Sequence, residues 1–443
     1  MDKQPDIQVG IVSASELRLD LLQEYHNQQT ESSVRGPQTF AYAPGGKVEW
    51  QGNLYDSLFF APGEHNAAFE VADVVIGVNF HWERRETQRF KGSFRIIVEG
   101  DRLTLVNVLP VEDYLMSVIS SEMSATANEE FLKAHAVISR SWLLAQIDKN
   151  KKLCSKEKEH FCSCTKTETE LVKWYDREDH VNFDVCADDH CQRYQGITRQ
   201  STPTVEKAVD ATRGLVLTDN DGNLCDARFS KCCGGVFEQF ENCWEPVHFH
   251  YLEALRDGAD EKNFPDLTVE ENAREWILGR PEAYCNTSDA EILGQVLNNY
   301  DQETSDFYRW TVRYSQAELA NLIKERSGID FGAIKALEPV ERGTSGRLVK
   351  LRIVGSEKTM TIGKELEIRR TLSTSHLYSS AFIVETEGTD ADGLPETFVL
   401  HGAGWGHGVG LCQIGAAVMS AQGKTFSEIL AHYFPGSSLK TLY

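Results

Sequence analysis

Residues 110–123 read Pro-Val-Glu-Asp-Tyr-Leu-Met-Ser-Val-Ile-Ser-Ser-Glu-Met, and the spacing of their apolar residues predicts a helix. Proline is tolerated in a first helical turn, and the acidic Glu112 and Asp113 that follow it favour the helix dipole. The apolar stripe consists of Val111, Tyr114, Leu115, Val118 and Ile119. One further turn along the same face are Glu122 and Met123. We therefore expect Glu122 to be the only carboxylate on the inward face of this helix.

The position of Glu122 makes it a candidate acid/base residue. A carboxyl group half buried on an apolar stripe loses hydration of its charged form, which raises its pKa toward the value that a general acid needs. The alternative is a glutamate at a helix end that pairs with a nearby lysine or arginine. The helix pattern alone leaves both interpretations open.

A second helix is predicted from Asn128, which can cap it, through Trp142. On this helix Lys133 and Arg140 are seven residues apart, which places both cations on one face at a separation of about 10 Å. Such a pair suits two anionic or hydroxyl-rich points on an extended ligand. The alternative is two solvated surface cations.

The wider chain indicates an α+β fold, in which β-rich segments surround a central helix pair that carries Glu122, with a mixed α/β insertion. The predicted regions are a β-rich N-terminal region (1–109), the helix pair with a Cys/His loop and following strands (110–258), a mixed α+β region (259–400), and a glycine-rich closing motif with a C-terminal helix that packs on the catalytic region (401–443). The clearest further elements are helices at 269–278, 316–326 and 425–433 and strands at 348–354 and 381–386.

The charge of the chain disfavours some partners. The net charge of −22 over 443 residues repels nucleic acid and anionic lipid. No stretch approaches the roughly 18 apolar residues of a membrane span. We therefore expect no nucleic-acid partner and no membrane span in this chain.

Two long motifs resemble the stage II sporulation protein D and amidase-enhancer family. The signature helix pair of the family resembles residues 109–123 together with residues 132–142, which read Leu-Lys-Ala-His-Ala-Val-Ile-Ser-Arg-Ser-Trp. Its closing motif resembles residues 401–416, which read His-Gly-Ala-Gly-Trp-Gly-His-Gly-Val-Gly-Leu-Cys-Gln-Ile-Gly-Ala. Shorter matches occur in the same order between these motifs. One departure is the pair Cys232 and Cys233, which stand where family members commonly have small hydroxyl residues.

The resemblance implies a lytic transglycosylase that acts on peptidoglycan glycan strands stripped of their stem peptides. Glu122 matches the family's catalytic acid/base, and Lys133 and Arg140 match its conserved cations. The implied reaction breaks the bond between N-acetylmuramic acid and N-acetylglucosamine and leaves a 1,6-anhydro product. The family also implies an alternative, a non-enzymatic glycan-binding activator of a cell-wall amidase. A zinc hydrolase is disfavoured because no H-E-x-x-H helix is present.

A cysteine- and histidine-rich stretch predicts a structural zinc site. Two thiols and two imidazoles within twelve residues suit tetrahedral zinc, and the stretch resembles a zinc-binding segment of some family members. The expected ligands are His180, Cys186, His190 and Cys191, and Tyr194 just after them is a candidate to face the substrate. A second group, which could bind metal or consist of free thiols, comprises Cys154, His160, Cys162 and Cys164. We expect no organic cofactor.

The glycine-rich end of the chain is not a phosphate-binding loop. Its glycines alternate with other residues from 402 to 410, which differs from the G-x-G-x-x-G spacing. Alternating glycines permit close backbone approach and unusual dihedrals, so Trp405, His407 and Gln413 could be presented to a sugar. For Trp405 a packing role is an equal alternative.

The implied substrate and the cysteine content point to different compartments. A peptidoglycan substrate implies the cell envelope or periplasm. The chain starts Met-Asp-Lys-Gln-Pro-Asp, with no basic region followed by an apolar run, and contains 11 cysteines. A cytoplasmic location therefore stays an alternative expectation.

Overall fold

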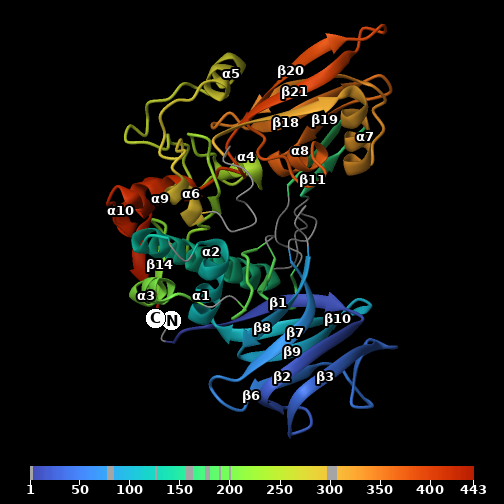
Figure 1. Cartoon of the computed structure of the whole chain (residues 1–443), viewed down its shortest axis with the longest axis vertical. Coiled ribbons are helices and arrows are strands. Elements are labelled where there is room, and N and C mark those ends of the chain that lie inside the picture. Colours follow the sequence, from blue (N-terminus) through green and yellow to red (C-terminus); the bar gives the residue numbers. More distant parts are fainter. Residues whose placement is uncertain are drawn as a thin grey trace. The chain divides into compact units, whose positions relative to one another are not determined.

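A computed structural model describes residues 3–76, 84–124, 127–155, 163–174, 180–188, 191–198, 201–296 and 307–443 (Figure 1). The chain forms two compact units. Unit 1 comprises residues 1–150, 178–216 and 439–443, and unit 2 comprises residues 151–177 and 217–438. The structure thus groups distant segments together, whereas the sequence suggested four consecutive regions.

Unit 1 is built on a large, mainly antiparallel sheet. Its strands are β1 (Asp6–Ala14), β2 (Glu16–Asn27), β3 (Ser32–Ala43), β4 (Lys47–Trp50), β5 (Asn53–Tyr55), β6 (Leu58–Pro62), β7 (Ala68–Ile76), β8 (Arg84–Lys91), β9 (Ser93–Glu99), β10 (Arg102–Pro110) and β13 (Val185–Cys186). The order is β13-β1-β10-β9-β6-β2-β3-β4-β5, with β7 paired to β2 and β8. Alternating residues of β2 such as Leu17, Leu19 and Leu21 are buried, as expected for a sheet with one covered face.

The three helices described in unit 1 gather on one side of its strands (Figure 1). They are α1 (Val111–Glu122), α2 (Glu129–Ser155), whose last turn belongs to unit 2, and α3 (Pro203–Ala211). Asn128 caps α2 as predicted, because its side chain accepts a hydrogen bond of 3.0 Å from the Glu130 N–H. The predicted helix pair is therefore present.

Unit 2 contains two larger sheets. One has the order β11 (Cys164–Lys166), β12 (Glu170–Lys173), β19 (Thr359–Gly363), β18 (Leu348–Gly355) and β17 (Ile334–Arg342), and the other has the order β16 (Arg309–Ser315), β21 (Pro395–Ala403) and β20 (Phe382–Thr389). Helices α7 (Gln316–Ser327) and α8 (Glu365–Thr371) lie beside these strands (Figure 1). Buried aliphatic residues such as Leu351, Ile353 and Ile362 form the core.

The remainder of unit 2 consists of short elements joined by loops. These are α4 (Phe240–Cys243), α5 (Glu270–Leu278), α6 (Ala290–Val296), α9 (Gln413–Ala421) and α10 (Phe426–Tyr433), with the parallel pair β15 (Phe229–Ser230) and β22 (Leu411–Cys412). Two further strands, β14 (Leu215–Thr218) and β23 (Ser438–Thr441), include the boundaries between the units. The predictions of α5, α7, α10, β18 and β20 are confirmed, with ends displaced by a few residues.

The described helices offer no candidate for a membrane span, since none of them is both long and apolar enough.

Candidate functional site

Glu122 is the last residue of α1 and is half buried. Its Oε1 accepts a hydrogen bond of 3.2 Å from the backbone N–H of Arg193. Arg193 belongs to the loop that follows the predicted zinc ligands, so that loop borders the carboxylate within unit 1. Apolar side chains of α1 such as Val118 and Ile119 are fully buried, which fixes the helix that carries Glu122.

The predicted zinc loop brings three of its four expected ligands together. One ligand atom from each of His180, Cys186 and Cys191 lies within 4.8 Å of the others. The short strand β13 anchors the loop, because it pairs in parallel with β1 and places Cys186 opposite Gly10. The fourth expected ligand, His190, lies outside the described residues.

The arrangement around these side chains fits the donor chemistry of zinc. The Cys186 N–H donates a hydrogen bond of 3.4 Å to Cys191 Sγ, a contact that favours a thiolate. Thiolate and imidazole donors suit a tetrahedral zinc ion. Of the second predicted group, Cys164 packs against the apolar core of unit 2, whereas His160, Cys162 and the side chain of Cys154 lie outside the described residues.

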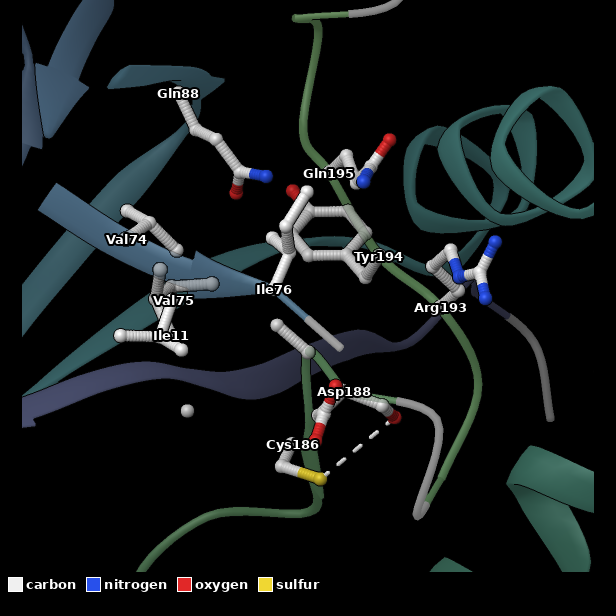
Figure 2. Close-up of a pocket in the computed structure, with 12 residues that line it drawn as sticks. Ile11, Val74, Val75, Ile76, Gln88, Cys186, Asp188, Arg193, Tyr194 and Gln195 are labelled. Carbon is white, nitrogen blue, oxygen red and sulfur yellow. Dashed lines mark hydrogen bonds between the residues drawn. The ribbon is translucent and has the colours of Figure 1, made fainter. Parts of the chain in front are cut away.

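A pocket in unit 1 borders the same loop. Its lining includes Val74 and Gln88 from the sheet and Cys186, Arg193 and Tyr194 from the loop (Figure 2). In Figure 2 the amide of Gln88 points into the space that the loop borders. Gln88 is 1% exposed, and both polar atoms of its amide lack a hydrogen-bond partner within the structure. A buried amide without partners costs free energy until a polar group, such as a water molecule or a ligand atom, pairs with it.

Tyr194 lines this pocket with its ring but does not present its hydroxyl to a ligand. The side chain is buried, and the hydroxyl donates a hydrogen bond of 2.6 Å to Asn107 Oδ1. The ring stacks on Tyr114, with 5.2 Å between the ring centroids. Burial raises the pKa of Tyr194 above its usual range. The hydroxyl is thus engaged within the protein and only the ring lines the pocket, so a contact between Tyr194 and the substrate stays a prediction.

Arg140 requires a correction. Its guanidinium is completely buried and donates hydrogen bonds to Glu112, from Nε to Oε1 at 2.9 Å and from Nη2 to Oε2 at 2.6 Å. A third bond of 2.9 Å goes from Nη1 to the Leu215 carbonyl. Arg140 therefore ties α2 to α1 and does not offer a cation to a ligand in this conformation. Glu112, and not only Glu122, is an inward-facing carboxylate of α1.

Lys133 does not share an exposed face with Arg140. Its ammonium bonds to the carboxylates of Glu129 at 2.7 Å and Glu130 at 2.8 Å, both in the first turn of α2. These hydrogen bonds raise the pKa of Lys133. The side chain keeps 16% of its surface exposed, so a contact between Lys133 and a ligand stays a prediction.

The glycine-rich loop of unit 2 is shaped by close backbone packing. Gly404, Gly406, Gly408 and Gly410 all have positive φ, between 72° and 94°. A Cβ atom on Gly408 would lie 2.4 Å from Cζ of Arg347, and one on Gly410 would lie 2.2 Å from the Arg228 carbonyl oxygen. Only glycine fits these positions, which confirms the expected close approach and unusual dihedrals.

His407 makes a hydrogen bond within this loop. Its Nδ1 accepts a hydrogen bond of 3.0 Å from the Val409 N–H, so Nε2 carries the proton of the neutral ring. Burial, followed by the nearby Arg228 and Arg347, lowers the pKa of His407 well below its usual range. Together these features give His407 a structural role in the loop, whereas its contact with a sugar stays a prediction.

The other two candidates in this loop differ in exposure. Trp405 is partly exposed and packs against Tyr378 and Phe307, with centroid distances of 4.2 and 4.7 Å, which supports a packing role and leaves a contact with a sugar as a prediction. Gln413 begins α9 and is 2% exposed. Its side chain is therefore buried at the start of α9, and its presentation to a sugar stays a prediction.

Comparison with known proteins assigns part of the chain to a family. Residues 99–218 match the family model described as Stage II sporulation protein. The chain carries a stage II sporulation protein domain. This domain includes Glu122 and the predicted zinc loop, which confirms the resemblance found in the sequence. Residues 238–410 match a domain of unknown function, DUF8618, which includes His407 but not Gln413.

The similarity to several relatives extends beyond the stage II sporulation protein domain. The amidase enhancer of Bacillus subtilis (strain 168) is 26% identical over 337 residues, covering 73% of this chain. The stage II sporulation protein D of the same strain is 23% identical over 391 residues, which is 87% of this chain and 91% of the relative. That of Bacillus amyloliquefaciens is 22% identical over 75% of this chain and 74% of the relative. The chain spans only 40% of the length of the amidase enhancer.

Proposed function

We propose that this chain acts on the bacterial cell wall as a lytic transglycosylase. The substrate would be peptide-free peptidoglycan glycan strands, cleaved between N-acetylmuramic acid and N-acetylglucosamine. The observation that carries the proposal is the placement of Glu122 inside the stage II sporulation protein domain, half buried at a helix end and bonded to the Arg193 N–H. A peptidoglycan substrate implies action in the cell envelope.

One carboxyl group can perform both proton transfers of this reaction. Protonated Glu122 donates its proton to the glycosidic oxygen as the bond to C1 of N-acetylmuramic acid breaks, and N-acetylglucosamine leaves with a free hydroxyl. The Glu122 carboxylate then accepts the proton of the C6 hydroxyl, whose oxygen forms the new bond to C1. The product is a 1,6-anhydro sugar, and Glu122 returns to its protonated form. No water enters, so the second carboxylate that hydrolysis uses is not needed.

The buried amide of Gln88 supports the proposal that the ligand is a sugar. An N-acetyl group has one N–H donor and one carbonyl acceptor, and an amide side chain offers the complementary acceptor and donor. Gln88 has both of these groups without a partner in the structure, in a pocket whose wall includes Arg193. We propose that this pocket receives an N-acetyl or hydroxyl group of the glycan.

We further propose that His180, Cys186 and Cys191 hold a zinc ion, with His190 as the fourth ligand. Support comes from the three described donors, which lie within 4.8 Å of one another. The ion would have a structural role, since four protein ligands leave no open coordination position. It would order a loop that has few apolar residues and that positions Arg193 beside Glu122.

The alternative is a non-enzymatic glycan-binding protein that activates a cell-wall amidase. It is favoured by the name of one relative, an amidase enhancer, of which this chain spans 40%. Both proposals predict glycan binding. They differ in whether new 1,6-anhydro ends appear when glycan strands are incubated with the chain alone.

Digestion of purified peptide-free glycan strands tests the proposal directly. Wild-type protein should release 1,6-anhydro products, detected by mass spectrometry, and Glu122→Gln should not. Glu24→Gln serves as a matched control, because Glu24 is a glutamate of unit 1 with 60% of its side chain exposed. Glycan binding without any anhydro product from the wild type would favour the amidase activator instead.

A further inference from the structure

A second group of possible metal ligands lies in unit 2, in a region to which the matched families assign no function. It consists of Cys233, Asp257, Cys285 and Cys412, which we call the buried thiol cluster. One ligand atom from each residue lies within 4.8 Å of the other three. All four residues are at most 2% exposed. They come from separate segments, with Cys412 at the N-terminus of α9.

Distances within the buried thiol cluster match tetrahedral zinc. Cys233 Sγ lies 3.5 Å from Cys285 Sγ and 3.5 Å from Asp257 Oδ2. With bonds of about 2.3 Å from zinc to sulfur and about 2.1 Å to oxygen, tetrahedral geometry puts two sulfurs about 3.8 Å apart and a sulfur and an oxygen about 3.6 Å apart. These two distances are thus close to the tetrahedral values, and all four ligand atoms lie within 4.8 Å of one another.

The carboxylate of Asp257 is held so that one oxygen faces the thiols. Its Oδ1 accepts a hydrogen bond of 2.8 Å from the Tyr433 hydroxyl, whereas Oδ2 accepts one of 3.0 Å from the Cys285 N–H and faces Cys233 Sγ. Outer hydrogen bonds of this kind orient carboxylate ligands in metal sites. Gly415 makes room for it, since a Cβ atom there would lie 2.6 Å from Oδ2.

Backbone N–H groups also point at the sulfurs. The Cys233 N–H donates to Cys412 Sγ at 3.2 Å, and the Gly235 N–H donates to Cys233 Sγ at 3.4 Å. Hydrogen bonds to sulfur stabilise the thiolate form, which is the form that binds metal. Gly235 has a φ of 109°, so the turn that aims this N–H requires glycine.

Two simpler interpretations explain less of this geometry. Buried cysteines often act as small apolar residues, but apolar packing does not account for a fully buried carboxylate directed at a thiol. A disulfide between Cys233 and Cys285 would leave Cys412 and Asp257 without a function in the cluster. A cation satisfies all four groups at once, and three sulfurs with one oxygen suit zinc better than magnesium or calcium.

We propose that Cys233, Asp257, Cys285 and Cys412 bind a structural zinc ion that links the loop segments of unit 2 to α9. The proposal is independent of the transglycosylase activity and of the zinc loop in unit 1. Because the four ligands are far apart in the sequence, the ion would stabilise the folded state by joining segments that have little regular structure between them.

Zinc analysis in a variant that lacks the unit 1 site tests this proposal. In Cys186→Ser/Cys191→Ser protein, purified without chelators, we expect about one zinc ion per chain by inductively coupled plasma mass spectrometry. Adding Cys285→Ser should remove this zinc ion. Adding Cys225→Ser should not, because Cys225 is a buried residue of unit 2 outside the cluster. No zinc in the double variant, or retention after Cys285→Ser, would overturn the proposal.

X-ray absorption at the zinc edge of the double variant identifies the zinc ligands directly, so the result does not depend on whether the triple variant folds. We expect a first shell of three sulfurs and one oxygen around zinc. A first shell of nitrogen and oxygen alone would contradict the proposal. Peptide mapping that finds Cys233 and Cys285 joined by a disulfide in most of the protein would contradict it as well.

Discussion

Arg140 and Glu112 form a completely buried ion pair between α1 and α2, with two parallel hydrogen bonds of 2.9 and 2.6 Å. The carboxylate also accepts a hydrogen bond of 3.3 Å from the Gly214 N–H. The pair, to which the Tyr443 hydroxyl also donates, therefore joins the helix that carries Glu122 to three other segments of unit 1. Positioning Glu122 through α1, and not contact with a ligand, is the role that this geometry supports for Arg140.

Replacing Arg140 should primarily lower stability. Arg140→Met leaves the Glu112 carboxylate buried without its charged partner, which should cost about 3–5 kcal/mol in the free energy of unfolding of unit 1. Arg140→Met combined with Glu112→Gln should recover part of this loss. Urea unfolding measured by circular dichroism provides the values. If Arg140→Met instead weakened glycan binding and left stability unchanged, the structural role would be wrong.

Periodicity explains why the helix pair was predictable and the ion pair was not. The apolar stripe of α1 identified its buried face, because side chains three and four residues apart share a face. Glu112 is in the first turn, where an acidic residue is usually explained by the helix dipole. Its partner is 28 residues further along and on another helix. Pairings between helices depend on tertiary structure, which local spacing does not encode.

Loss of zinc from the unit 1 loop should reduce activity without changing the acid/base residue. Cys191→Ser removes one of three described donors, and the loop that positions Arg193 beside Glu122 should become less ordered. We expect a lower zinc content, faster hydrogen exchange in residues 180–198 and slower release of anhydro product. Cys225→Ser, at a buried thiol of unit 2 outside both groups of possible ligands, provides a control. Unchanged zinc content in Cys191→Ser would contradict the assignment of this ligand.

Gln88→Met should raise stability and weaken glycan binding. The substitution keeps the size of the side chain but removes a buried amide that has no hydrogen-bond partner among the described residues, a change worth about 1–3 kcal/mol. If the pocket receives a polar group of the glycan, the dissociation constant measured by calorimetry should increase. Opposite changes in stability and affinity identify a binding residue. A variant with higher stability and unchanged affinity would show that the pocket does not bind this ligand.

The N-terminus of α10 should become less stable in acid. Hydrogen bonds from the Thr425 N–H, Lys424 and the Thr425 hydroxyl lower the pKa of Glu428 from 4.5 to about 2. Since this pKa is lower in the folded state, the stabilisation is complete above pH 4.5 and is lost as the pH falls toward 2. Glu428→Gln should therefore speed hydrogen exchange in residues 426–433 at pH 7 but have little effect near pH 2. Glu271→Gln, in the first turn of α5, is the control, and equal effects of Glu428→Gln at both pH values would contradict the assignment.

The thiol-containing sites differ in how far the sequence could reveal them. His180, Cys186 and Cys191 are within twelve residues, so their spacing alone suggested a metal site. The cysteines of the buried thiol cluster are separated by as many as 179 residues, and only the fold brings Cys233 to Cys412. The sequence marked Cys233 as a departure from the family pattern without indicating its neighbours.

The measurement that tests the central claim most directly is the initial rate of 1,6-anhydro product release by the wild type and by Glu122→Gln. Both proteins should be compared on the same peptide-free glycan strands, at equal zinc content and with folding checked by circular dichroism. General acid–base catalysis predicts a rate about 10²–10⁴-fold lower for Glu122→Gln, with glycan binding retained. Equal rates for the two proteins would contradict the role of Glu122 as the acid and base of this reaction.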